Sequence, residues 1–131
     1  MICLDSSFLI DILRNKKEAV DKAREMEKFG FGITSISVFE VMIGFYLKNK
    51  DYASRYANFE ELISNLEVLN LDLNSAILSS KISAKLTTEG KIIEQSDCLI
   101  AGIMFSNGVS SILTRNISHF TRIKGIKVIP Y

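Results

Sequence analysis

Short apolar runs alternate with longer amphipathic stretches along the whole chain of 131 residues. The runs are too short for helices and are rich in Ile, Leu and Val, which is typical of buried strands. They predict five short strands, at Ile2–Asp5, Phe31–Thr34, Glu67–Leu71, Ser111–Thr114 and Lys127–Ile129.

Between these runs, apolar residues recur at the spacing that places them on one face of a helix. The pattern predicts helices at Ser6–Arg14, Glu18–Phe29, Ser37–Leu47, Asp51–Leu66 and Ser96–Phe105, and one that Asp72 caps and that ends near Gly90. The stretch from Ser37 to Leu47 is so apolar that we expect a buried helix. Strands that alternate with helices indicate parallel βαβ units. We therefore predict an α/β fold, a three-layer α/β/α sandwich around a mostly parallel sheet, as one domain over residues 1–131.

Composition and charge narrow the class of protein. Hydrophobic residues make up 47% of the chain, which is typical of a compact domain, and the formal net charge of +1 gives no global field that attracts a polyanion. Cys3 and Cys98 both lie in apolar runs, so we expect buried free thiols and a reducing, cytoplasmic location. We expect no secretory signal, because no basic segment precedes the first apolar run, and no apolar run approaches the ~18 residues of a membrane span.

Three carboxylates fall at predicted junctions between elements: Asp5 at the end of the first strand, and Glu40 and Asp97 near the starts of two apolar helices. Ligands bind at the carboxyl edge of an open α/β sheet, so these residues are candidates for one site. Three acids gathered there would repel one another, and burial would raise their pKa values. A divalent cation removes that penalty, and Mg²⁺ prefers oxygen ligands of this kind.

Each carboxylate also has a purely structural interpretation. Ser37 and Glu40 have the spacing of a capping box, Asp97 suits the N-terminus of a helix, and Asp5 suits a helix cap. All three carboxylates are expected at the same edge of the sheet, which favours a shared ligand site over three separate capping roles. Asp11 and Asp72 are interpreted as surface or capping residues.

Other chemistries have less support in the sequence. His119 is the only histidine and falls on a predicted loop, which is a poor basis for a zinc site or a Ser-His-Asp triad. The chain has no P-loop and no G-x-G-x-x-G motif. Ser6 and Ser7 follow Asp5 where a phosphate-accepting regulatory domain would have clustered acids, and Ser7 occupies the place of the second Asp of a haloacid-dehalogenase-like phosphatase.

Four segments resemble, in order and spacing, the signature segments of PIN domains, and in particular those of VapC-type toxins of toxin–antitoxin pairs. They are Met1–Ile10, Thr34–Glu40, Ser96–Gly102 and Leu113–Phe120. The resemblance implies a Mg²⁺- or Mn²⁺-dependent ribonuclease on an α/β/α sandwich. It also implies a homodimer with an RNA substrate, held inactive by a small antitoxin protein.

Carried over by position, the resemblance makes Asp5, Glu40 and Asp97 the catalytic, metal-binding acids and Ser6 a polar neighbour of the site. The family commonly has a fourth acid in the segment that here runs from Thr114 to Asn116. Asn116 offers a carbonyl oxygen without a charge, so we expect it and Thr114 to make secondary contacts. One metal or two remains open, as does an alternative function, a PIN-like protein-binding module with weak or no catalysis.

Local basic groups and surplus aromatic residues suggest where partners bind. The cations nearest in sequence to the site segments are expected to contact RNA phosphates, chiefly Arg14, Lys16 and Arg115, together with Lys17, Arg122 and Lys124. The aromatic residues between positions 39 and 59 exceed what one face of a small core needs, so we expect some of them to be exposed at a homodimer interface. They are Phe39, Phe45, Tyr46, Tyr52, Tyr56 and Phe59.

Overall fold

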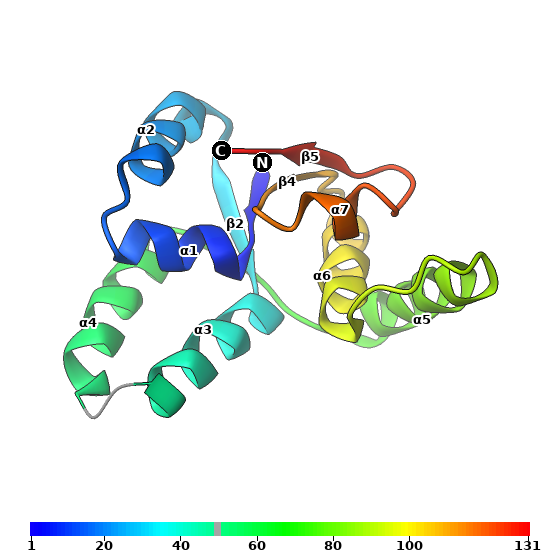
Figure 1. The fold of residues 1–131 in the computed structure, drawn as a ribbon, viewed down its shortest axis with the longest axis horizontal. Helices are drawn as coiled ribbons and strands as arrows, with labels where there is room; N and C mark the ends of the chain where they lie inside the picture. Colours follow the sequence, from blue (N-terminus) through cyan, green and yellow to red (C-terminus); the bar gives the residue numbers. More distant parts are fainter. Residues whose placement is uncertain (49–50) are drawn as a thin grey trace.

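A five-stranded, wholly parallel sheet forms the middle of the computed structural model, which describes residues 1–48 and 51–131 (Figure 1). Its strands are β1 (Ile2–Leu4), β2 (Phe31–Thr34), β3 (Glu67–Leu69), β4 (Ser111–Leu113) and β5 (Lys127–Ile129). They lie in the order β3-β2-β1-β4-β5, so β1 is central. The chain winds outward from β1 to β3 and then crosses back to β4. The winding therefore reverses beside β1, which is where α/β sheets of this kind bind ligands.

Helices cover both faces of the sheet. Their bounds are α1 (Ser6–Leu13), α2 (Lys17–Met26), α3 (Ser35–Lys48), α4 (Tyr52–Ile63), α5 (Leu73–Thr88), α6 (Gln95–Ser106) and α7 (Ile117–Phe120), with a short 3-10 helix at Glu27–Phe29. Figure 1 shows α1 to α4 together on one side of the strands and α5 and α6 on the other.

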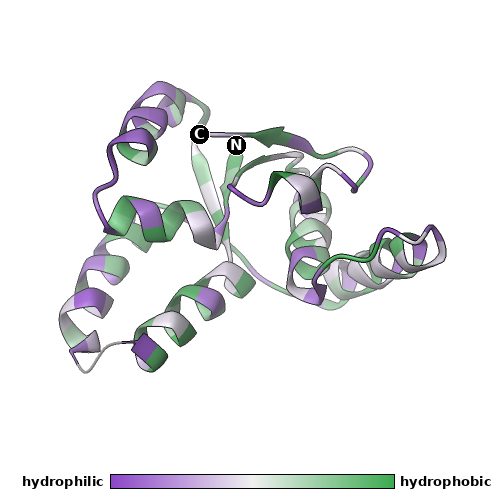
Figure 2. Ribbon diagram, viewed as in Figure 1, coloured by the Kyte–Doolittle hydropathy of each residue, from purple (hydrophilic) through white to green (hydrophobic). Residues whose placement is uncertain are grey.

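Two hydrophobic cores lie between the sheet and the helices, one on each face of the sheet. Ile2 and Leu4 of β1 pack with α1 to α4, whereas Cys3 points to the opposite face and packs with α5 and α6. Side chains alternate between the faces of a strand, so a strand that is apolar throughout serves both cores. Figure 2 shows the hydrophobic colour on β1 and a mostly hydrophilic α2 at the surface.

The predicted fold class and all five strands are confirmed, and Asp72 caps α5 through a hydrogen bond that its side chain accepts from the Ser75 N–H. Cys3 and Cys98 are buried and free, as expected. Within the described ranges, no helix combines the length and the apolar character that crossing a membrane requires. Three predicted strands end one or two residues too late, and the segment at 18–29 divides into α2 and the 3-10 helix.

The expectation of a buried helix at Ser37–Leu47 is wrong. Helix α3 buries a single stripe, Ser37, Val41 and Phe45, at the four-residue spacing that keeps side chains on one face. Its other face is open to solvent, with Phe39 60% and Leu47 80% exposed. High apolar content in this helix therefore does not mean that the helix is enclosed.

Helices α5 and α6 cross closely at Gly102. A methyl group at this position would lie 2.6 Å from the Ser75 carbonyl oxygen and would overlap the Ser79 hydroxyl. Replacing Gly102 with Ala should therefore push the two helices apart. Overpacking of this kind costs about 1–3 kcal/mol of stability, which urea unfolding will measure.

Gly44 provides the control, because it lies within α3 and a methyl group there meets nothing within 4 Å. Gly44→Ala should raise stability by roughly 0.5–1 kcal/mol, since alanine restricts the unfolded chain and favours helix. Equal effects of the two substitutions would contradict the close crossing.

Candidate active site

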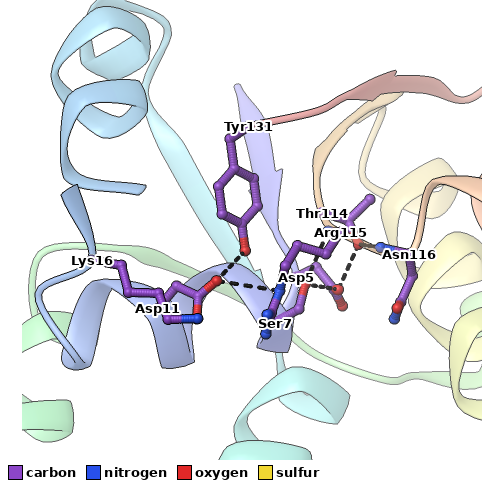
Figure 3. A network of polar contacts seen from close by, with 8 residues as sticks. All are labelled: Asp5, Ser7, Asp11, Lys16, Thr114, Arg115, Asn116 and Tyr131. Atoms are coloured by element: carbon purple, nitrogen blue, oxygen red, sulfur yellow. Dashed lines mark hydrogen bonds and ion pairs between the residues drawn. The ribbon is translucent and has the colours of Figure 1, made fainter. Parts of the chain in front are cut away.

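Asp5 follows the last residue of β1, at the carboxyl edge of the sheet. Its backbone N–H donates to the Leu113 carbonyl at 3.0 Å, which ties it to β4, and its residue is only 1% exposed. Carboxylate oxygen Oδ2 accepts two hydrogen bonds of 2.7 Å, from the Ser7 and Thr114 hydroxyls (Figure 3). Oxygen Oδ1 is buried and has no hydrogen-bond partner among the described residues.

The segment Thr114–Asn116 wraps around this carboxylate. Thr114 is fully buried, and its hydroxyl accepts a hydrogen bond of 2.9 Å from the Asn116 N–H while donating to Asp5. The Arg115 N–H donates to the Ser7 hydroxyl at 3.2 Å. Two backbone groups thus fix the two hydroxyls that hold Asp5. The orientation of Asp5 is therefore determined by Thr114, which follows β4, and by Ser7 of α1.

Asp97 lies in the first turn of α6 and is 3% exposed. Its Oδ2 is 2.6 Å from Nδ1 of His119, a residue of the short helix α7. Burial is the main reason that the pKa of Asp97 is raised to about 6; the contact with His119 opposes the shift, and the charges of Asp5 and Glu40 add to it. Asp5 and Glu40 are therefore near enough for their charges to affect Asp97.

Glu40 comes from α3, the helix that follows β2, and is partly exposed. The structure thus brings the three predicted acids to the same edge of the sheet, on segments that follow β1 and β2 and precede β4. Among the described residues, no three His, Cys, Asp or Glu side chains are close enough to form a ready-made metal cluster. The three acids therefore share an edge of the sheet without forming a closed ligand cage.

The capping-box interpretation of Glu40 is wrong, whereas Asp5 and Asp97 do lie at the N-termini of α1 and α6. Helix α3 begins two residues before Ser37, whose N–H donates to the buried Thr34 hydroxyl at 3.0 Å, so Ser37 and Glu40 form no capping box. Asp5 is the N-cap residue of α1 but makes no side-chain capping bond, and Asp97 turns to His119 instead of the helix backbone.

The residues of the site suit a hard divalent cation. Mg²⁺ takes oxygen ligands, keeps several waters and needs only one or two protein carboxylates. Asp5 Oδ1 offers a buried oxygen without a hydrogen-bond partner among the described residues. Burial raises the pKa of Asp97, the charges of Asp5 and Glu40 add to that effect, and a cation relieves repulsion of this kind. A Zn²⁺ site with several nitrogen or sulfur ligands does not fit, because His119 is the only histidine and both cysteines are in the cores.

Two of the expected neighbours differ in the structure. Ser7, rather than Ser6, donates to Asp5, because the turn into α1 points the second serine at the carboxylate. Asn116 is exposed and contributes its backbone N–H, and no hydrogen bond of its side chain appears among the described residues. Thr114 makes the expected contact.

Sequence reasoning missed His119 as a partner of Asp97. It lies on α7, which the sequence analysis treated as a loop, because four residues are too few for a detectable periodicity. Helix α7 places its half-buried ring against α6, 22 residues away in sequence. Spacing along the chain gives no sign of that pairing.

The interpretation of Asp11 as a surface or capping residue is also wrong. It is 2% exposed and pairs with Lys16 at 2.9 Å and with Arg115 at 3.2 Å, and it accepts a hydrogen bond of 3.0 Å from the Tyr131 hydroxyl. Two of the cations expected to meet RNA therefore lie against a carboxylate. Arg14 lies apart from them, with Arg55 and Phe45 at a surface pocket.

Comparison with known proteins shows the family to which the chain belongs. Residues 2–126 match the model of the PIN domain, and the chain therefore belongs to the PIN domain family. A tRNA(fMet)-specific endonuclease VapC of Salmonella typhimurium is 32% identical over 125 residues, which are 95% of this chain and 93% of that protein.

Two solved structures share the fold over nearly the full length of both chains. DNA-bound VapBC from Salmonella typhimurium superposes with a TM-score of 0.86 at 31% identity, covering 99% of this chain and 98% of that one. VapBC2 from Rickettsia felis, bound to a promoter DNA fragment, superposes with a TM-score of 0.88 at 21% identity, covering 100% and 99%. The similarity in sequence and in fold is thus to the VapC type of PIN domain.

The raised pKa of Asp97 predicts how stability depends on pH without metal. Between pH 4 and 6 the Asp97 carboxyl binds more protons in the folded state than in the unfolded state, because it titrates at about 6 when folded and near 3.8 when unfolded. The contribution of Asp97 to the free energy of unfolding should therefore fall as pH rises through this range. Asp97→Asn lacks the titrating group and should lose less stability over the same range.

Urea unfolding in EDTA, at intervals from pH 4 to 6, measures the difference between wild type and variant. That difference should decline with pH. A difference that stays constant would show that Asp97 titrates normally.

Proposed function

We propose that this protein is a divalent-metal-dependent endoribonuclease, the toxin component of a toxin–antitoxin pair. The observation that carries the proposal is the state of Asp5: one carboxylate oxygen is fixed by two hydroxyls, and the other is buried with no hydrogen-bond partner in the described parts of the chain. Membership of the PIN domain family and the similarity to VapC endonucleases support the same conclusion.

Asp5, Asp97 and Glu40 would hold the cation, with Asp5 as the central ligand. When bound, Mg²⁺ or Mn²⁺ supplies Lewis-acid chemistry toward a phosphodiester. Ser7 and Thr114 keep Asp5 in one orientation, and His119 does the same for Asp97. Outer contacts of this kind typically change metal affinity or activity by about 10–100-fold when removed. The two hydroxyls and the imidazole thus orient the side chains that would bind the cation.

Asn116 in place of a fourth acid favours a site with a lower total charge. Its side chain is exposed, and the structure gives it no hydrogen bond to the three acids within the described residues. We therefore favour one cation over two. The alternative function, a protein-binding module without catalysis, predicts no cleavage with either metal.

The proposed partners are RNA and a small antitoxin protein. Two structures with the same fold are of VapBC bound to DNA. Exposed Lys and Arg side chains are expected to contact the phosphates of RNA without distinguishing its base sequence. RNA binding should therefore weaken as the salt concentration rises.

Cleavage of a mixed RNA pool tests the proposed activity. Wild type should cleave with Mg²⁺ or Mn²⁺ and stop in EDTA, and Asp5→Asn should lower the rate at least ~100-fold, because it removes the charge of the central ligand. Asp21→Asn is the matched control, since Asp21 is an exposed acid that pairs with Lys17 on α2.

Two results would contradict the proposal. Wild type without activity under either metal, in the absence of any antitoxin, would favour the binding module. Full activity of Asp5→Asn would remove Asp5 from its central role.

The expected homodimer also stays a prediction. Phe45 and Phe59 are buried in the core, whereas the other four aromatics of this region are 43–60% exposed on α3 and α4. They are Phe39, Tyr46, Tyr52 and Tyr56. Light scattering at micromolar concentration should give twice the monomer mass; a monomer alone would contradict the prediction.

A further inference from the structure

Asp11 is a buried carboxylate outside the group of three acids, and three side chains contact it. Lys16 pairs with Oδ1, and Arg115 and the Tyr131 hydroxyl both contact Oδ2. Burial alone raises the pKa of Asp11, but the hydrogen bonds from Lys16 and Tyr131 and the charges of Arg115 and Lys16 outweigh it and leave the pKa below its usual value. Asp11 is therefore a fixed negative charge at neutral pH.

These contacts join three separate parts of the chain. Asp11 is on α1, Arg115 is in the connection from β4 to α7, and Tyr131 follows β5. The Tyr131 ring also packs edge-on against Phe8, with ring centres 4.7 Å apart. A carboxylate removed from water costs free energy unless it is paired, so the arrangement that pairs Asp11 is strongly preferred.

Arg115 is held twice by the same face of α1. Ser7 and Asp11 are four residues apart, so their side chains lie on one side of the helix. Ser7 accepts the Arg115 N–H at 3.2 Å, and Asp11 holds the guanidinium at 3.2 Å (Figure 3). The first contact is at the long end of the range for a hydrogen bond, and the ion pair with Asp11 attaches Arg115 to α1 a second time.

The position of Arg115 in turn determines the surroundings of Asp5. Thr114 precedes it and Asn116 follows it; the Thr114 hydroxyl donates to Asp5 Oδ2, and the Asn116 N–H donates to that hydroxyl. Ser7, the other donor to Asp5 Oδ2, is the residue that accepts the Arg115 N–H. Two hydroxyls thus occupy one oxygen of Asp5 and leave Oδ1 without a partner among the described residues.

We propose that Asp11 is a positioning residue for Asp5, acting through Arg115. The ion pair sets the segment 114–116 against α1 so that both hydroxyls point at Oδ2 and Oδ1 is available to a cation. Arg115 then serves the site by holding its backbone in place, rather than by binding RNA phosphate. This inference rests on the proposed function, because it concerns the same metal site.

Mn²⁺ affinity of the isolated protein, measured by titration calorimetry, tests the proposal without relying on catalysis. Asp11→Asn and Arg115→Gln should each weaken binding about 10-fold, as loss of outer contacts to a ligand typically does. The Mn²⁺ affinity of the double variant should equal that of the single variant with the lower affinity, because both substitutions break the same ion pair. Asp21→Asn removes the same charge from an exposed pair with Lys17 and should match wild type.

Amide hydrogen exchange gives a second measurement that needs no metal. The N–H groups of Arg115 and Asn116 should exchange faster in Asp11→Asn, since the segment that shields them is released. The Arg115 side chain is 48% exposed, so Arg115→Gln should stay folded even if Asp11→Asn loses stability. In RNA cleavage, a positioning role lowers kcat and changes KM by less than twofold.

The outcomes separate this inference from the proposed function. Wild type that neither binds Mn²⁺ nor cleaves RNA would overturn both. Wild type that does both, with Asp11→Asn and Arg115→Gln equal to Asp21→Asn in Mn²⁺ affinity, would overturn the positioning role alone. A raised KM for Arg115→Gln with unchanged Mn²⁺ affinity would show that Arg115 binds phosphate instead.

Discussion

The structure around the site depends on one buried carboxylate whose two oxygens have different surroundings. Asp5 Oδ2 is held by the Ser7 and Thr114 hydroxyls, and Oδ1 is buried with no hydrogen-bond partner among the described residues. Burying a negative charge on the central strand is costly, and two neutral donors on one oxygen repay only part of that cost. A ligand at the other oxygen would offset the remaining free-energy cost, and a divalent cation is suited to do so.

The fold explains why this carboxylate is held so firmly. Strand β1 lies between β2 and β4, apolar on both faces, and the two cores fix its position. The winding of the chain reverses beside it, so the segments after β1, β2 and β4 all reach the same edge. Helices α6 and α7 add Asp97 and His119 from the other layer. The stability lost to repulsion among the acids is a cost that functional sites commonly carry.

Much of this arrangement follows from the sequence, because its causes are local. An apolar run that ends at Asp5, or a helix that Asp72 caps, has a signature within a few residues. The contacts of Asp11 do not: its three partners are five, 104 and 120 positions away, and only the folded chain brings Arg115 and Tyr131 to it. The pairing of His119 with Asp97 was missed for the same reason. Helix α3 shows the opposite failure, since its composition indicates burial that its neighbours do not provide.

A crystal soaked in Mn²⁺ tests the central claim most directly, because anomalous scattering locates the ion itself. We expect a peak within coordination distance of Asp5 Oδ1 and near Asp97, with Oδ2 still held by Ser7 and Thr114. A peak bound to Oδ2 in place of the hydroxyls, or no peak at Asp5 at a Mn²⁺ concentration that supports RNA cleavage, would contradict it.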